Sequence, residues 1–188
     1  MDIYEILDSI YILSDESKTK LIKNIRKVTY PKGHILVKAN TIENNIYFIK
    51  KGVARAYSDT PDNEITFWFG WEGHTIISMK SYIEQSISYE NIELLEECEL
   101  YELNSEQLQN LYNQDIQIAN WGRKFAEKEL IKIEERLINH QFQSATERYR
   151  HLLLHHPNLI QRIQLGYIAS YLGITQVSLS RIRSEIKF

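Results

Sequence analysis

The first part of the chain carries apolar residues at helical spacing. Between Ile3 and Val28 they recur three and four positions apart, which is the period that keeps side chains on one face of a helix. Ser14 stands two residues before Glu16, and a serine at this place accepts a hydrogen bond from an unpaired N–H of the first helical turn. We therefore expect short amphipathic helices over this segment.

Short apolar runs rich in β-branched and aromatic residues follow, from Tyr30 to about Leu103. Glycine, asparagine and the polar segment 59–63 separate these runs. Many short strands divided by turn residues are typical of a β-sandwich or a β-barrel. The predicted strands are His34–Val37, Ile46–Ile49, Val53–Tyr57, Ile65–Phe69, Thr75–Ile77, Ile92–Leu95 and Leu100–Leu103.

A short helical stretch begins at Ser105, and a proline-free helical pattern then runs from about Asp115 to Gln143. A helix of this length is about 40 Å long. We expect it to pair with a second copy, and the alternative is that it packs on its own sheet. Gly122 lowers the stability of a helix by about 1 kcal/mol relative to alanine. A close approach of two helix backbones would explain why a glycine stands there. The apolar residues near one stripe are Ile118, Trp121, Phe125, Leu130, Ile133 and Leu137.

The last 45 residues predict three helices, from Ser144 to His156, from Gln164 to Leu172 and from Thr175 to Ile186. Pro157 ends the first, and Gly173 lies in the tight connection between the other two. This order, with apolar residues where the two helices cross, is the helix-turn-helix pattern. The alternative is a helical hairpin with an ordinary polar surface.

The last of these helices carries the side chains that would read DNA. Gln and Arg form paired hydrogen bonds with purine edges in the major groove. We expect base contacts from Gln176, Ser178 and Arg181, and phosphate contacts from Thr175, Ser180 and Arg183.

Composition excludes several classes of protein. With 188 residues, 43% of them hydrophobic, the chain can bury a large core without a disulfide or a structural metal. The single Cys98 rules out an intramolecular disulfide and a cysteine-rich cluster. No apolar run approaches 18 residues, and no basic start precedes an apolar stretch. We therefore expect a cytoplasmic protein with no membrane contact.

The net charge of −3 is unevenly distributed. Residues 1–139 carry a net −7, whereas residues 140–188, whose cations include Lys187, carry a net +4. Such asymmetry suggests an acidic body that carries a basic interaction module. The tail charge therefore favours DNA binding, although the whole-chain charge does not.

The chain resembles the Crp/Fnr family of bacterial transcription regulators. The similar segments are Lys32–Gly33, Ile46–Val53, Arg55–Tyr57, Ala169–Ile174 and Leu179–Ile182. The resemblance implies an α+β fold with flanking helices around an antiparallel β-roll (a double-stranded β-helix), a long dimerisation helix and a C-terminal three-helix helix-turn-helix unit. It implies an effector domain over residues 1–113, the dimer helix over 114–143 and the DNA-binding domain over 144–188.

Two departures from the family pattern stand out. Members that bind cyclic AMP hold it with a Gly-Glu pair and a later Arg-Ser pair, but the corresponding positions here are Ile77, Ser78, Ser88 and Tyr89. Residues 81–122 hold nine acids and no Lys or Arg, so an anion would be repelled. We expect no cyclic AMP binding. The second departure is that the chain stops at Phe188, where family members continue into a β-hairpin wing.

The resulting prediction is a homodimeric, non-enzymatic transcription regulator that binds a pseudo-palindromic operator, requires no cofactor or metal, and has an effector that the sequence does not name. Its reading helices would lie about 34 Å apart. The first alternative is a β-roll that binds a small ligand or a protein and has a purely structural tail. The second is a cupin-like metal enzyme, for which the histidines are unfavourably spaced: His34 and His74 stand alone, and His151 and His155 lack an acidic partner.

Overall fold

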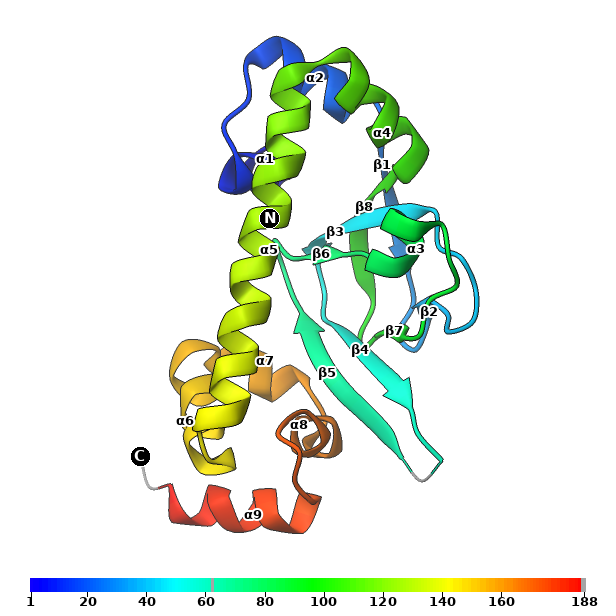
Figure 1. Ribbon diagram of the computed structural model, residues 1–188. Coiled ribbons are helices and arrows are strands. Elements are labelled where there is room, and N and C mark those ends of the chain that lie inside the picture. Colours follow the sequence, from blue (N-terminus) through cyan, green and yellow to red (C-terminus); the bar gives the residue numbers. More distant parts are fainter. Residues whose placement is uncertain (62, 187–188) are drawn as a thin grey trace.

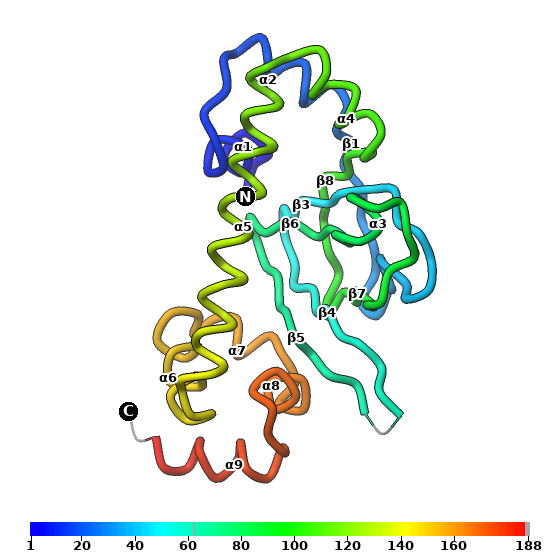
Figure 2. Tube along the Cα trace, in the orientation of Figure 1, coloured from blue at the N-terminus to red at the C-terminus, as the bar shows by residue number. Residues whose placement is uncertain are grey.

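A computed structural model describes residues 1–61 and 63–186 and shows a mixed α+β protein. An antiparallel β-sandwich lies beside one long helix, and the chain ends in a group of short helices below both (Figures 1 and 2). Asp62, in a predicted turn, and the tail cation Lys187 lie outside the described residues, as does Phe188.

The N-terminal prediction of helices is confirmed as far as residue 22. The two helices are α1 (Ile3–Ile10) and α2 (Asp15–Ile22). Ser14 caps α2 as predicted, because its side chain accepts from the Ser17 N–H. The prediction of helix up to Val28 is wrong: Ile25–Tyr30 is strand β1, which pairs with a later strand along its whole length. Ladder hydrogen bonds to a distant strand override the local helical spacing there.

Eight strands form two four-stranded antiparallel sheets, ordered β1-β8-β3-β6 and β2-β7-β4-β5. This arrangement confirms the prediction of an antiparallel β-sandwich or roll. The remaining strands are β2 (Ile35–Val37), β3 (Asn45–Lys51), β4 (Ala54–Asp59), β5 (Glu64–Gly70), β6 (Thr75–Ile76), β7 (Asn91–Leu94) and β8 (Cys98–Asn104). A short helix that the sequence did not predict, α3 (Met79–Glu84), lies between β6 and β7, and α4 (Ser105–Gln114) follows β8.

The long helix α5 (Ile116–Phe142) begins inside the protein's own core. Ile118 and Trp121 are fully buried against α1 and the first sheet, and the Trp121 Nε1–H donates to the Leu7 carbonyl oxygen at 3.1 Å. The Trp121 ring also stacks on Phe125, with ring planes 8° apart. Assigning Ile118 and Trp121 to a dimer stripe was therefore wrong, because they are already covered within one chain.

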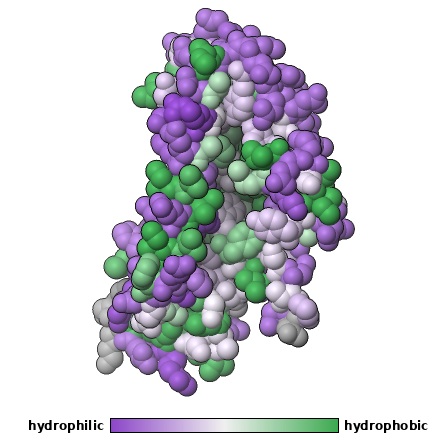
Figure 3. Space-filling model, viewed as in Figure 1, coloured by the Kyte–Doolittle hydropathy of each residue, from purple (hydrophilic) through white to green (hydrophobic). Residues whose placement is uncertain are grey.

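Further along α5 the apolar residues are uncovered. Leu130 is 66% exposed, and Ile133 and Leu137 are about half exposed. Figure 3 shows apolar residues gathered over this lower part of the helix, and a hollow between the helix and the β-sandwich. The long helix thus has a buried first third and an apolar surface on its remainder.

Gly122 fits against an aromatic ring rather than against a second backbone. A Cβ at this position would lie 2.3 Å from the Tyr112 hydroxyl oxygen and 2.4 Å from its Cζ. Tyr112 comes from α4, so the glycine allows α4 and α5 to pack closely.

The described part of the tail, up to residue 186, contains four helices, so the prediction of three is wrong. They are α6 (Ala145–His155), α7 (Pro157–Arg162), α8 (Leu165–Tyr171) and α9 (Gln176–Glu185). Pro157 ends α6 and also starts α7, because a proline in the first helical turn lacks an N–H that would be unpaired anyway. None of the described helices is long and apolar enough to cross a bilayer.

Replacing Gly122 with alanine should destabilise the protein by about 1 to 3 kcal/mol, because the added methyl group overlaps the Tyr112 ring. The same change at Gly166 in α8 meets nothing within 4 Å. It should therefore be neutral or stabilising by up to about 1 kcal/mol, as helix propensity predicts. Urea unfolding of both variants measures the two effects. Equal effects from the two changes would rule out close packing as the reason for Gly122.

Candidate functional site

The connection between α8 and α9 is built by local hydrogen bonds. Gly173 has a φ of +69°, a left-handed conformation that favours glycine. The N–H of Ile174 donates to the Ala169 carbonyl oxygen at 3.0 Å and so closes the end of α8. Thr175 then caps α9, because its Oγ1 accepts from the Ser178 N–H at 3.1 Å. This short connection sets the angle at which α9 leaves α8.

The outer face of α9 is polar and uncovered. α9 lies at the edge of the molecule farthest from α2 (Figure 1), and it packs through Leu179 and Ile182. Gln176, Ser178 and Arg181 are all exposed. The structure therefore places all three predicted base-contacting residues on the surface of one helix.

The three predicted phosphate contacts are also exposed, but two of them have local roles. The Thr175 hydroxyl caps the helix and lies 2.9 Å from the Ser178 Oγ. Ser180 donates to the Gln176 carbonyl oxygen at 3.0 Å. Arg181 and Arg183 form no ion pair with a described residue. The two guanidinium groups are thus the positive charges that α9 presents to solvent, and Glu185 at its end is exposed as well.

Val177 is a candidate that the sequence analysis missed. Its side chain is 72% exposed, one turn before Arg181 on the face away from Leu179. An apolar side chain at this place can contact a thymine methyl group. The helical phase set by Leu179 and Ile182 would have identified it, because it lies opposite those buried positions.

The tail is fastened to the β-sandwich by a charged cluster. Arg162 of α7 donates to both carboxylate oxygens of Glu72, at 2.8 and 3.0 Å, and also pairs with Glu96. The Gly52 N–H donates to Glu72 as well, at 2.9 Å. Partial burial raises the pKa of Glu72, but these hydrogen bonds outweigh it and lower the pKa to about 2.

Helix α8 is also docked on β5, the last strand of its sheet. The Thr66 N–H donates to the Ser170 Oγ at 2.9 Å, and this hydroxyl donates to the Glu64 carbonyl oxygen at 3.0 Å. The Tyr167 ring lies 3.7 Å from the guanidinium carbon of Arg55, which is 2% exposed. These contacts hold α8, and with it the start of α9, in a defined place relative to the sandwich.

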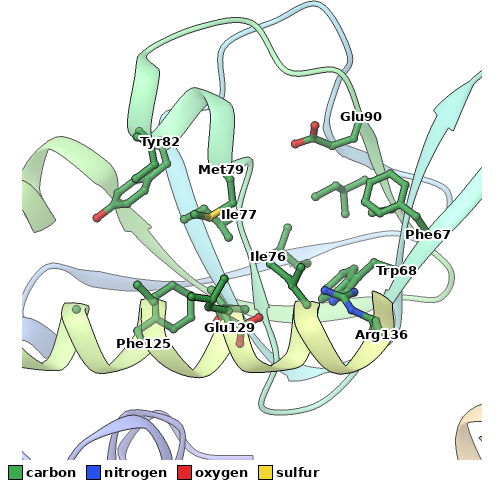
Figure 4. A pocket seen from close by; sticks show the side chains of 18 of the residues that line it. Phe67, Trp68, Ile76, Ile77, Met79, Tyr82, Glu90, Phe125, Glu129 and Arg136 are labelled. Atoms are coloured by element: carbon green, nitrogen blue, oxygen red, sulfur yellow. The ribbon is translucent and has the colours of Figure 1, made fainter. Parts of the chain in front are cut away.

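A cavity of about 840 Å³, here called the roll cavity, lies between the sandwich, α3 and α5 (Figure 4). Its wall is mainly aromatic and aliphatic. The aromatic residues are Phe67, Trp68, Tyr82, Tyr89, Tyr112 and Phe125, and the charged ones are Glu90, Glu129 and Arg136. A cavity of this size can hold a small organic ligand.

The four positions that correspond to the phosphate-binding pairs divide between this cavity and the loop beside it. Ile77 and the exposed Tyr89 line the cavity. Ser88 donates to the Lys38 carbonyl oxygen at 2.8 Å, and the buried Ser78 hydroxyl has no hydrogen-bond partner among the described residues. The sequence analysis missed Arg136, a cation that reaches this cavity from α5.

The other reactive residues have no shared site. Burial raises the pKa of the Cys98 thiol to about 11, so burial, more than its acidic neighbours, keeps it protonated. The His151 and His155 rings lie 4.2 Å apart. In residues 1–61 and 63–186, no three His, Cys, Asp or Glu side chains gather as a metal site would need.

Sequence comparison finds a likeness for the β-sandwich. Residues 27–115 match the family model described as the cyclic nucleotide-binding domain. The matched segment begins in β1 and ends at the residue before α5, so it spans the sandwich and leaves the long helix and the tail outside it. No curated protein matches the chain by sequence.

Regulators of the Crp/Fnr type share the fold of nearly the whole chain. FixK2 from Bradyrhizobium japonicum has a TM-score of 0.73 and 18% identity over 86% of this chain and 83% of its own. The c-di-GMP-responsive regulator CLP from Xanthomonas campestris has a TM-score of 0.68 and 16% identity over 92% and 91%. A protein described as a transcriptional regulator of the Crp/Fnr family, from Eubacterium rectale, has a TM-score of 0.72 and 20% identity over 92% and 83%.

The charged cluster of Arg162, Glu72 and Glu96, between the tail and the β-sandwich, predicts a pH dependence of stability. Glu72 has a pKa of about 2 in the folded protein against 4.5 for the free side chain. Its ionised form therefore stabilises the fold above pH 4.5, and this stabilisation is lost as the pH falls towards 2. The difference in melting temperature between wild type and Glu72→Gln should be largest near neutral pH and should shrink over this interval. Circular dichroism melts at several pH values measure it.

Glu134→Gln is the matched control, because Glu134 is exposed on α5 and forms no ion pair with a described residue. Its melting temperature should follow that of the wild type at every pH. A Glu72→Gln difference that stays constant from pH 7 to pH 2 would show that the ionised carboxylate is not what fastens the tail.

Proposed function

We propose that this protein is a DNA-binding transcription regulator of the Crp/Fnr type, and that α9 reads the major groove. The single observation that carries the proposal is the outer face of α9. That face presents Gln176, Val177 and Arg181 to solvent with no described carboxylate paired to the arginine. Arginine and glutamine are suited to purine edges, and valine to a thymine methyl group.

The capped turn before α9 supports the same function. A reading helix must keep its angle while its side chains meet the bases, and here Thr175, Gly173 and the docked Ser170 hold the start of the helix. The hydroxyls of Thr175 and Ser180 lie at the cap and in the first half of α9, and Arg183 lies in its last turn. We propose that all three contact phosphates.

The protein would act as a dimer through the exposed part of α5. Leu130, Ile133 and Leu137 recur at spacings of three and four residues, the pattern of a coiled-coil seam. They are uncovered in the single chain. Two chains paired along this seam would present two α9 helices to one face of DNA, so the operator should be a pseudo-palindrome.

The favoured effector is not cyclic AMP. A cyclic phosphate needs a cation, and the described wall of the roll cavity offers only Arg136, together with two carboxylates, Glu90 and Glu129. The pairs that hold the ribose and the phosphate in cyclic-AMP-binding members have no counterpart at Ile77, Ser78, Ser88 and Tyr89. An apolar, aromatic wall suits an uncharged ligand better.

Gel-shift assays with the DNA upstream of the protein's own gene test the DNA-binding function. Arg181→Ala should weaken specific binding by about 1 to 3 kcal/mol and relax the preference at one base pair of each half-site, because a paired hydrogen bond to guanine is lost. Arg183→Ala should weaken binding to all sequences alike and lower the salt dependence by about one counterion.

Arg123→Ala on α5 is the control, because its side chain is exposed far from α9. It should leave binding unchanged. If Arg181→Ala weakens binding to every DNA sequence equally, Arg181 contacts phosphate instead of a base. If the wild type shifts no DNA at low salt, the protein is a ligand-binding or interaction module without DNA contact.

Isothermal titration of the full-length protein with cyclic AMP should give no heat of binding up to millimolar ligand, because no cation pair compensates the phosphate charge. A second titration uses the double variant Glu90→Gln, Glu129→Gln, in which the two carboxylates of the cavity wall are replaced by neutral amides. Micromolar binding by the wild type would contradict the effector proposal and leave DNA binding untouched.

A further inference from the structure

A second cavity, of about 710 Å³, lies where the β-sandwich, the lower half of α5 and the tail helices meet. We call it the junction cavity. The sandwich contributes Trp68, Trp71 and His74, α5 contributes Lys132 and Arg136, and the tail contributes Arg148. It shares Phe67, Trp68 and Arg136 with the roll cavity but extends to the opposite side, towards the tail.

Positive charge dominates the wall of the junction cavity. Its cations are Lys132, Arg136 and Arg148, and its one acidic residue is Glu135. Lys132 pairs with Glu129 at 2.6 Å. No carboxylate in the described part of the chain lies within ion-pair distance of Arg136 or Arg148. Arg148 donates instead to backbone carbonyl oxygens, which leave its charge uncompensated.

Two neighbouring side chains lie close to these cations. Burial, together with the nearby Lys132 and Arg136, lowers the pKa of His74 to about 4. Burial raises the pKa of Tyr171, while Arg136 and Arg148 act in the opposite direction. His74 belongs to the sandwich side and Tyr171 to the tail, and both line the cavity together with the three cations.

The same cavity carries flat apolar surface. The Trp71 ring lies 4.0 Å from the His74 ring and 4.5 Å from the His156 ring, with the ring planes tilted by 56° and 52°, so the sandwich and the tail meet here through aromatic contacts. Trp68 lines the cavity next to Arg136 (Figure 4). Arg136 and Arg148 are half-buried beside these rings, with no carboxylate among the described residues in ion-pair distance. Partial loss of water around an unpaired charge is unfavourable, and a bound anion would supply the missing partner.

We propose that the junction cavity binds a small organic anion that carries an aromatic ring. The ring would pack against Trp68 and Trp71, and the carboxylate or sulfonate would accept hydrogen bonds from Arg136, with Lys132 adding charge. This site is separate from the DNA-reading face of α9, and it favours an anion whereas the roll cavity suits an uncharged ligand. The inference does not depend on DNA binding.

Two dyes of matching shape test the proposal on the full-length protein. The anionic dye is 8-anilinonaphthalene-1-sulfonate, and N-phenyl-1-naphthylamine has the same rings without the sulfonate. Fluorescence titration should show tighter binding of the anionic dye. Arg136→Gln should weaken that binding about tenfold, as expected for losing a charge-assisted hydrogen bond, and should leave the neutral dye unaffected. Lys132→Gln, an exposed position, should give a smaller loss of the same kind.

Two tryptophan variants locate the site. Asn139 lines only the junction cavity and Met79 only the roll cavity. Asn139→Trp should abolish the high-affinity binding of the anionic dye, and Met79→Trp should leave it intact. Arg123→Gln removes an arginine of α5 outside both cavities and should have no effect.

Three results would overturn the proposal. The first is loss of anionic-dye binding in Met79→Trp and not in Asn139→Trp, which would place the dye in the roll cavity. Both dyes could bind equally tightly, which would mean that the sulfonate is not recognised. Arg123→Gln could weaken binding as much as Arg136→Gln, which would mean that only overall charge is sensed. Since no DNA is present, these outcomes leave the proposed regulator function unaffected.

Discussion

The burial of Ile118 and Trp121 is the constraint on which the rest of the structure depends. These residues fix the first turns of α5 in the core beneath α1, with the Trp121 N–H bonded to the Leu7 carbonyl oxygen. Because a helix is stiff, fixing one end sets the direction of the other. The lower half of α5 therefore forms a wall of both cavities, exposes Leu130, Ile133 and Leu137, and delivers the tail to β5.

Local signals in the sequence predicted the elements that depend on local physics. The strands of the sandwich, the cap at Ser14, the extent of α5 and the turn at Gly173 all follow from periodicity and turn residues. The errors occurred where contacts between residues distant in the sequence determine the secondary structure or the packing. β1 is a strand because β8 pairs with it, and Gly122 is explained by a tyrosine from another helix. Neither partner is visible in a window of a few residues.

The same division applies to the candidate site. Gln176, Ser178 and Arg181 could be placed on the exposed part of one helix from the sequence, because the buried Leu179 and the partly buried Ile182 determine which side of that helix is covered. Val177 could have been found in the same way. Arg136 could not, since it reaches the cavities from a helix that follows the domain in sequence. Charge counts over a segment therefore describe that segment's surface better than they describe a cavity enclosed by several elements.

The contact between Ser170 and β5 has a consequence for the sheet itself. β5 is an edge strand, and an uncovered edge is a template on which other chains can add strands. By accepting from the Thr66 N–H and donating to the Glu64 carbonyl oxygen, one hydroxyl of α8 occupies part of that edge. The tail thus shields the sandwich from edge-to-edge aggregation, and a domain cut off after α5 would lose that shield.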